Sequence, residues 1–305
     1  MSTLRTVHKI FTAPEQAEGA GARVRRSIGS KYLRALSPFL MLDHLDGATG
    51  EGFPDHPHRG QETVSYILKG SVEHEDFAGH RGVLHAGDLQ SMTAGRGIMH
   101  SEQPIPSEDG SSGAGLQLWV DLPRQLKMCE PRYRDLKAAE IPVAKLDDGK
   151  VTAKVISGVS GGVDSVRDLT YTPIWYLDIQ IQPGGEIAQH VPQGWNAMAY
   201  VVEGSAQVSS STEDERKEAQ RFQAVVFGLE GDAVQMRVPD TAAVGARILL
   251  IAGEPLDQPV VQHGPFVVTS SQEARQALED FYSYKNGFER AAGWESRSSK
   301  RLARS

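Results

Sequence analysis

Apolar and polar residues alternate along most of this chain in short stretches, which predicts many β-strands and few helices. Residues 62–68 (ETVSYIL) alternate with the period of a half-buried strand. Residues 115–120 (GLQLWV) place leucine and valine on one face and Trp119 on the other. Residues 6–11 and 38–47 are further predicted strands. The pattern therefore indicates an all-β protein.

One segment near the C-terminus changes to a helical period. Ser270 stands three residues before Glu273, the spacing of a capping box, and Asn286-Gly287 would end the helix. Five residues form the predicted apolar stripe: Ala274, Ala277, Leu278, Phe281 and Tyr282. We expect this helix to pack across a barrel. The basic tail 293–305 that follows is predicted to be disordered.

The second half of the chain repeats the first in outline. Residues 52–71 align with residues 185–205, each with a strand, a turn, an apolar strand and then Gly-Ser. The GDLQSMTAG stretch that begins at Gly87 matches GDAVQMRVP, which begins at Gly231. This repeat predicts two domains of similar fold, and we place the linker within residues 131–150.

Composition narrows the class of protein. The 305 residues include 31 glycines and 16 prolines, which suits short strands joined by turns. No run approaches the roughly 18 apolar residues of a membrane span, and the N-terminus lacks the apolar core of a signal peptide, so we expect a cytoplasmic or nuclear protein. Cys129 is the single cysteine, which rules out an internal disulfide framework. The net charge of −7 argues against direct binding to nucleic acid.

The candidate chemistry lies in two pairs of residues with i, i+2 spacing. His56 and His58 form one pair, and His100 and Glu102 form the other. Side chains two apart leave a strand from the same face, so two facing strands would bring four ligands together. Three imidazoles and one carboxylate can bind a metal and leave positions open for a substrate. A lone His-x-His is usually a polar strand edge, but two such pairs favour a metal site.

Glu62 is open to two interpretations. It follows His58 by four residues, where it would be either a metal ligand or a partner that orients an imidazole. An uninterrupted strand would put it on the inward face with the histidines, but the Arg59-Gly60 step could break that register. Three further histidines are predicted to be loop or turn residues outside the site: His74, His80 and His85.

Three arginines lie close together in the N-terminal region. Arg23 and Arg25 share strand parity, whereas Arg26 points the other way. Such a cluster is usually a solvated face. The alternative is a docking patch for an acidic partner.

Seven stretches of this chain together carry a family resemblance: FPDHPHRG, ETVSYIL, HEDFAGH, GDLQ-MTAGRGIMHSE, GLQLWV, KNGFERA and GEP-QPVVQHGPFV. In order and density they resemble the pirin family of the cupin superfamily, from about Ala20 to Ala292. The resemblance implies a bicupin fold, with two antiparallel jelly-roll barrels packed face to face and a few short helices. It also implies one iron per chain, with the ligand motif falling on His56, His58, His100 and Glu102. Glu62 is not a ligand in that family, which favours its orienting role.

The expected domains are residues 1–138, a metal-binding barrel, and residues 139–292, a second barrel, followed by the tail 293–305. Only His190 stands near the position of the first histidine pair in the second half, and neither His nor Glu replaces the second pair. The second barrel is therefore predicted to be metal-free. Manganese, nickel or copper would also suit the nitrogen and oxygen ligands of the first.

The resemblance implies two functions. The first is a dioxygenase similar to quercetin 2,3-dioxygenase, which uses O₂ to open the ring of a flavonol-like small molecule with loss of carbon monoxide. Glu62 would orient a ligand or accept the substrate proton. The alternative is a nuclear, redox-responsive transcription cofactor that binds a Rel-family (NF-kappa-B-type) factor and has no essential enzymatic role, with Arg23, Arg25 and Arg26 as its docking patch. In either case we expect a monomer that does not bind membranes.

Overall fold

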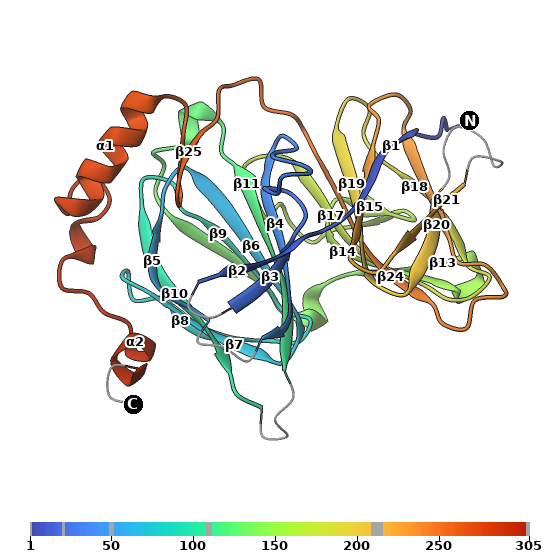
Figure 1. The fold of residues 1–305 in the computed structure, drawn as a ribbon, viewed down its shortest axis with the longest axis horizontal. Coiled ribbons are helices and arrows are strands. Elements are labelled where there is room, and N and C mark those ends of the chain that lie inside the picture. The colour runs from blue at the N-terminus through green and yellow to red at the C-terminus, as the bar shows by residue number, and fades with distance from the viewer. Residues whose placement is uncertain (1, 20–21, 49–51, 108–111, 209–215, 303–305) are drawn as a thin grey trace. The chain divides into compact units, whose positions relative to one another are not determined.

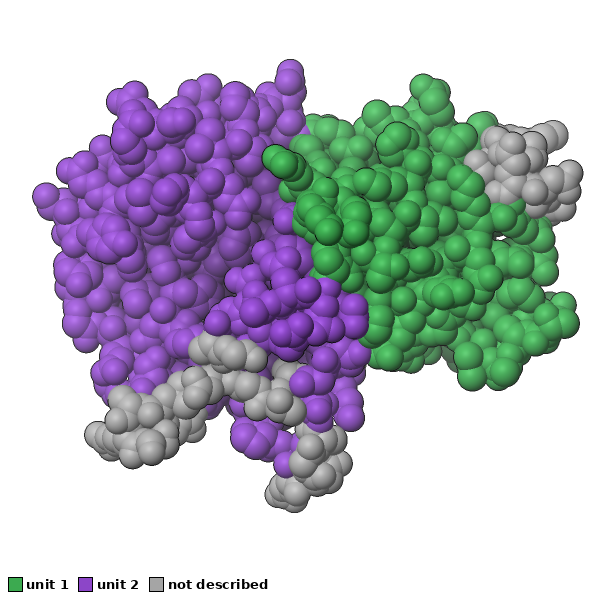
Figure 2. All heavy atoms as spheres, in the orientation of Figure 1, with its two compact units in different colours: residues 1–14, 30–38, 139–255 green, residues 15–29, 39–138, 256–305 purple. Residues whose placement is uncertain are grey.

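The computed structural model describes residues 2–19, 22–48, 52–107, 112–208 and 216–302. The chain divides into two compact units, which Figure 2 colours separately. Unit 1 comprises residues 1–14, 30–38 and 139–255, and unit 2 comprises residues 15–29, 39–138 and 256–305. Each unit is built from antiparallel sheets, which confirms the predicted all-β class.

Unit 2 contains a seven-stranded and a four-stranded sheet (Figure 1). The larger sheet has the order β12 (Arg132–Leu136), β9 (Leu89–Thr93), β6 (Gln61–Lys69), β11 (Gly113–Asp121), β4 (Phe39–Ala48), β3 (Ala22–Arg26) and β2 (Glu15–Glu18). The smaller has the order β5 (Phe53–His58), β10 (Ile98–Ile105), β7 (Ser71–Asp76) and β8 (Arg81–His85). A hairpin of β25 (Val261–His263) and β26 (Phe266–Val268) belongs to the same unit.

Unit 1 has the same two sheet sizes. Its larger sheet has the order β1 (Val7–Thr12), β22 (Gln223–Phe227), β19 (Asn196–Glu203), β24 (Ala246–Gly253), β17 (Ile174–Ile181), β14 (Val151–Ser157) and β13 (Val143–Leu146). Its smaller sheet has the order β18 (Glu186–His190), β23 (Ala233–Arg237), β20 (Ser205–Val208) and β21 (Lys217–Gln220), and β15 (Val159–Ser160) pairs with β16 (Val163–Asp164). Apolar side chains between these sheets form one core.

The compact units differ from the expected domains at both ends of the chain. β1 was expected in the first barrel, but it pairs with β22, with Val7 opposite Phe227 and Thr12 opposite Gln223. Residues 256–305 belong with the histidine-bearing sheets and not with the second barrel. Strand alternation indicates which face of a strand is buried but not which strand it pairs with. The placement of β1 in unit 1 and of residues 256–305 in unit 2 could therefore not be predicted from the pattern.

Strand order also corrects the expected alignment of the repeat. β23 lies between β18 and β20, as β10 lies between β5 and β7, so β23 is the counterpart of β10. The GDLQSMTAG stretch forms β9, whose counterpart by position is β22. The sequence match of β9 with β23 was therefore wrong, because both stretches begin with the Gly-Asp of a tight turn.

The predicted C-terminal helix is present as α1 (Ser271–Tyr282). Ser270 caps it by accepting a hydrogen bond from the backbone N–H of Glu273, as the sequence predicted. Ala274 and Ala277 are buried, but Tyr282 is 75% exposed and does not belong to the packed stripe.

The tail expected to be disordered contains a second helix, α2 (Arg297–Leu302). Short 3₁₀ helices span Arg124–Leu126, Ala138–Glu140, Asp147–Gly149 and Glu289–Ala291. Within the described ranges, no helix combines the length and apolar character needed to cross a bilayer.

Candidate metal centre in unit 2

Three of the four predicted ligands converge in unit 2. β5 carries His56 and His58, β10 carries His100, and the two strands pair with His100 directly opposite His56. The three ring centroids are 4.4 to 5.0 Å apart. One nitrogen from each ring lies within 4.8 Å of the others, a spacing at which three imidazoles can hold one metal ion.

Hydrogen bonds on the outer side of two rings leave the inner nitrogens free for a metal. Nδ1 of His56 lies 2.7 Å from the carbonyl oxygen of Pro54, to which it can donate. The side-chain amide of Gln61 lies 2.8 Å from Nδ1 of His58. Among the described residues, Oε1 of Gln61 has no hydrogen-bond partner as the amide is placed. The oxygen and nitrogen ends of the amide have the same shape, and exchanging them lets Nδ1–H of His58 donate to Oε1. These contacts favour the tautomer with a lone pair on Nε2.

The surroundings of the buried inner ring nitrogens test whether a metal fits between the three imidazoles. Within the part of the chain that the structure describes, Nε2 of His58 and Nε2 of His100 are buried without a hydrogen-bond partner. A buried polar atom without a partner is costly, and a coordinated cation would satisfy both nitrogens. The donor set therefore fits a divalent transition metal.

Burial keeps these imidazoles neutral. It lowers the pKa of His56 to about 4, with a further lowering from His100 and an opposing effect of Glu102. Burial likewise lowers the pKa of His100 to about 4, and the pKa of His58 lies well below its ordinary value. The metal-binding form of each ring is thus already present at neutral pH.

Acidification tests this electrostatic arrangement. The pKa of His56 and of His100 is about 4 in the folded chain, against 6.5 for an ordinary histidine, so protons compete for these rings only in acid. We expect half of a bound metal to be released below about pH 5, measured by elemental analysis after buffer exchange. A midpoint near pH 6.5 would contradict the lowered pKa values. The metal-free chain should lose stability as the pH falls from 6.5 towards 4, because only the unfolded chain then binds protons.

Glu102 lies beside the imidazole cluster, at the edge of a cavity. Its Oε1 accepts a hydrogen bond from Ser65 at 2.9 Å, and its Oε2 accepts one from Gln117 at 3.4 Å. Its carboxylate lies outside the set of nitrogens that converge within 4.8 Å. The cavity has a volume of about 280 Å³ and is also lined by Ser65 and Gln117. Its apolar walls include Leu45, Phe53, Ile67, Val72, Pro104 and Ile105.

Glu62 lies on the other face of β6. It pairs with Val120, whereas Ser65 pairs with Gln117, so Glu62 and Ser65 point to opposite sides of the sheet. Glu62 is fully buried and accepts a hydrogen bond of 2.5 Å from Thr93. Of the two alternatives that the sequence left open, the uninterrupted strand that would put Glu62 on the face of the histidines is not observed, because β5 and β6 belong to different sheets.

The chain turns at Gly60, between β5 and β6. Its φ of +76° is unfavourable for other residues, and a Cβ there would lie 1.9 Å from the carbonyl oxygen of Val267. The turn at Gly60 brings Gln61, rather than Glu62, against His58. The Arg59-Gly60 step in the sequence did indicate that the strand could break here. It did not indicate whether Gln61 or Glu62 would face the imidazole of His58.

This geometry separates the roles of Gln61 and Glu62. Gln61→Ala should weaken metal binding by about 10–100-fold, the usual cost of losing the partner that orients a ligand. Glu62→Gln should leave metal affinity within about threefold of the unmodified chain, because its hydrogen bond goes to Thr93. Competition with a metal-binding dye measures both. The opposite ranking would restore Glu62 as the orienting residue.

Other residues near the site differ from their predicted positions. His74 and His85 lie on β7 and β8 and not in loops, whereas His80 is in the turn between them. The side-chain amide of Gln90 lies 3.1 Å from Nε2 of His74. Trp119 packs edge-on against His58 at 5.2 Å, on the face of β11 opposite the leucine and valine side chains.

The corresponding strands of unit 1 carry apolar side chains. Ile187 of β18 pairs with Met236 of β23, and both lie in the hydrophobic core. Val234 is also buried there, whereas His190 is exposed and packs near Trp175. That unit 1 holds no metal stays a prediction, which these apolar positions favour.

Carboxylates engage all three arginines of the predicted docking patch. Arg23 and Arg25 pair with Glu15 at 2.5 and 3.0 Å. Arg26 forms two hydrogen bonds of 2.6 and 2.7 Å to Asp43 and also pairs with Glu18. Partner binding at this patch stays a prediction, but the nearby carboxylates lower the positive potential on which it depends.

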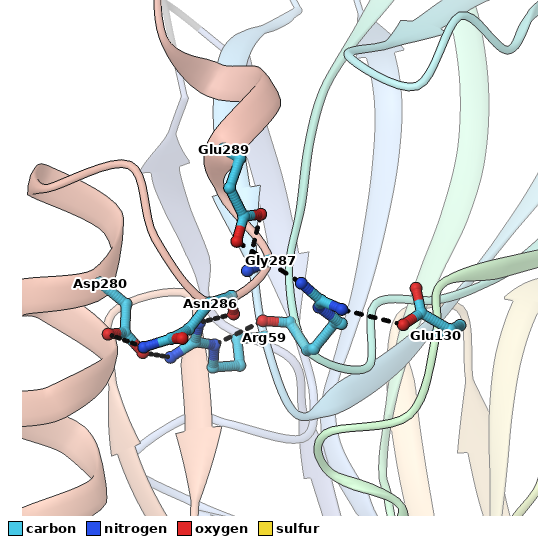
Figure 3. A network of polar contacts seen from close by, with 7 residues as sticks. Arg59, Glu130, Asp280, Asn286, Gly287 and Glu289 are labelled. Carbon is cyan, nitrogen blue, oxygen red and sulfur yellow. Dashed lines mark hydrogen bonds and ion pairs between the residues drawn. The ribbon is translucent and has the colours of Figure 1, made fainter.

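A buried ion pair anchors the turn that follows His58. Arg59 donates to Asp280 of α1 at 2.7 Å, and both side chains are 3% exposed (Figure 3). It also donates to the carbonyl oxygens of Asn286 and Arg96, each at 2.7 Å. Burial alone would raise the pKa of Asp280, but hydrogen bonds from Arg59 and its neighbours lower it overall. The C-terminal segment thereby fixes the end of a ligand-bearing strand.

Comparisons with known proteins agree with this architecture. The family model for pirin matches residues 21–120, and the model for the pirin C-terminal cupin domain matches residues 176–287. Pirin of Homo sapiens is 48% identical over 298 residues, covering 97% of this chain and 99% of that protein. Pirin-like protein 2 of Arabidopsis thaliana is 44% identical over 290 residues, covering 95% of this chain and 88% of that protein.

A solved structure has a similar fold. The crystal structure of quercetin 2,3-dioxygenase from Acinetobacter baumannii matches with a TM-score of 0.82 and 29% identity, covering 93% of this chain and 99% of that one. The family models together span more than half of the sequence. The chain therefore belongs to the pirin family and has its two-domain cupin architecture.

Proposed function

We propose that this chain is a metal-dependent dioxygenase that opens the ring of a flavonol. The observation that carries the proposal is the cluster of three neutral imidazoles close to a largely apolar cavity, in which Nε2 of His58 and Nε2 of His100 are buried without a hydrogen-bond partner among the described residues. Ligand sites typically have such walls, with a few polar groups that fix orientation. The likeness to quercetin 2,3-dioxygenase of A. baumannii supports a flavonol as substrate.

His56, His58 and His100 would hold the metal, with Glu102 as the fourth ligand. We propose iron, because imidazole and carboxylate donors with open positions suit that metal in oxygenases. A bound iron would supply the redox step that lets a flavonol react with O₂. In the structure, the carboxylate of Glu102 lies outside the set of nitrogens that converge within 4.8 Å.

The residues around the cavity explain how a flavonol would be held. Apolar side chains such as Phe53, Ile67 and Ile105 would contact the planar rings and exclude water from them. The carboxylate of Glu102 is the polar group that can accept the proton of the 3-hydroxyl. Ser65 and Gln117 hold that carboxylate in place through their hydrogen bonds.

The test compares two substrates with the iron-loaded chain. Quercetin should be consumed in an O₂-dependent reaction, whereas the matched flavone without the 3-hydroxyl should not react. Loss of the flavonol absorption band measures both rates. Equal reaction of both compounds, or no reaction of quercetin with a chain that holds iron, would refute the proposal.

A further inference from the structure

The C-terminal segment from Trp294 to Leu302 packs against the sheet that carries the imidazoles. Figure 1 places α2 beside the β5 side of this sheet, and α2 contacts β5. Side chains alternate along a strand, so Asp55 and Ser101 point to the face opposite that of His56 and His100. The segment therefore binds the outer face of the strands whose inner face carries the ligands.

Two hydrogen bonds attach the segment to β5. The backbone N–H of Ser296 donates to Oδ2 of Asp55 at 3.0 Å, and the hydroxyl of Ser299 donates to Oδ1 at 2.9 Å. Asp55 is the residue before His56. Hydrogen bonds to a carboxylate are stronger than those between neutral groups, so this contact ties the segment firmly to a ligand-bearing strand.

A chain of serine hydroxyls attaches the same segment to β10. The hydroxyl oxygens of Ser298 and Ser101 lie 2.9 Å apart, and Ser298 also lies 2.9 Å from Ser296. All three serines are at most 5% exposed. Ser101 stands between His100 and Glu102, so this contact reaches the second ligand-bearing strand. The backbone N–H of Arg297 adds a hydrogen bond to Glu75 of β7.

The contacts of the C-terminal segment include an edge strand of the four-stranded sheet. Among the described strands, β5 lies at the edge of its sheet with β10 as its neighbour, yet it carries two of the three histidines. The pairing of β5 with β10 is also irregular between His100 and Glu102. Edge strands fray more easily than central ones, so the distance between the imidazoles depends on what holds β5 in place.

We propose that residues 294–302 form a clamp that positions His56 and His100 by joining β5 to β10 from outside. This inference rests on the metal centre of the proposed function but not on its substrate. Ser298 and Asp55 are the positioning residues. Without the clamp, β5 separates from β10 more often, and each separation removes His56 from the ligand set.

The experiment measures metal release from the cobalt-loaded chain into excess chelator, followed by the visible absorption of Co(II). Ser298→Ala and Asp55→Asn should each speed release about tenfold, within the range found for outer partners of metal ligands. Both should also shift the cobalt bands, which report ligand geometry. Lys300→Ala, an exposed position on α2, is the matched control and should release cobalt at the unmodified rate.

A double-mutant cycle separates the clamp from a general loss of stability. Ser101→Ala combined with Ser298→Ala should release cobalt no faster than either single variant, because each change breaks the same contact. Additive effects, or unmodified release rates with unchanged cobalt bands, would overturn the clamp. Faster release from a chain that does not consume quercetin would support the clamp and refute the dioxygenase. An unmodified chain that binds no metal would overturn both.

Discussion

His100→Ala is expected to reduce the metal content from about one ion per chain to below about 0.1, because the substitution removes a ligand itself and not only a partner that orients a ligand. His100 is the sole imidazole that β10 contributes to the cluster, and it lies directly opposite His56. Its removal leaves two imidazoles from one edge strand. Elemental analysis of the purified chain, with protein measured by amino-acid analysis, gives the ratio.

Two histidine variants serve as controls for this loss. His85→Ala removes an exposed imidazole of β8 that is hydrogen-bonded to Ser71. His190→Ala removes the exposed imidazole of β18 in unit 1. Both should retain about one ion per chain. A loss of metal in His190→Ala would show that unit 1 binds metal, and unchanged metal in His100→Ala would exclude the proposed cluster.

Arg59→Ala is expected to lower the free energy of unfolding of unit 2 by about 3–5 kcal/mol. The substitution leaves the carboxylate of Asp280 buried without its cation, and it also removes hydrogen bonds to two carbonyl oxygens (Figure 3). The Arg59 guanidinium further stacks over the ring of Phe288, 4.8 Å from its centroid. Chemical unfolding followed by the near-ultraviolet signal measures the loss.

Arg96→Ala is the matched control for this ion pair. Arg96 belongs to the same network, but its side chain is 35% exposed and its partners Glu130 and Glu289 are 79% and 57% exposed. Exposed ion pairs contribute little, so the expected loss is at most about 1 kcal/mol. An equal loss in both variants would contradict the view that the buried pair at Arg59 anchors the C-terminal segment.

Features set by neighbours in the sequence could be predicted. The cap of α1 depends on Ser270 and Glu273, three residues apart, and the helix begins where that spacing placed it. Strand alternation places His56 and His58 on one face of β5, because their i, i+2 spacing is local. The position of His100 opposite His56 depends on the pairing of β5 with β10, which alternation alone does not give. Glu102 was predicted to converge with the three imidazoles, but its carboxylate instead accepts hydrogen bonds from Ser65 and Gln117 at the cavity.

Features that depend on distant contacts could not be predicted. Arg59 meets Asp280 across 221 residues of sequence, and no periodic pattern links the two. Gln61, and not Glu62, lies against His58 because the chain turns at Gly60. An uninterrupted strand would instead have put Glu62 on the same face as His58. The order of the tail depends on Asp55 and Ser101, strand residues that satisfy its serines. The prediction of disorder used only the basic and polar composition of this tail, which does not show these contacts.

The proposed activity is tested most directly by the carbon monoxide released when the iron-loaded chain reacts with quercetin and O₂. A flavonol dioxygenase should release carbon monoxide in proportion to the quercetin consumed. His100→Ala, prepared in the same way, should release no more than the protein-free background. Consumption of quercetin without carbon monoxide, or equal release from His100→Ala, would contradict a ring-opening reaction at the imidazole cluster of unit 2.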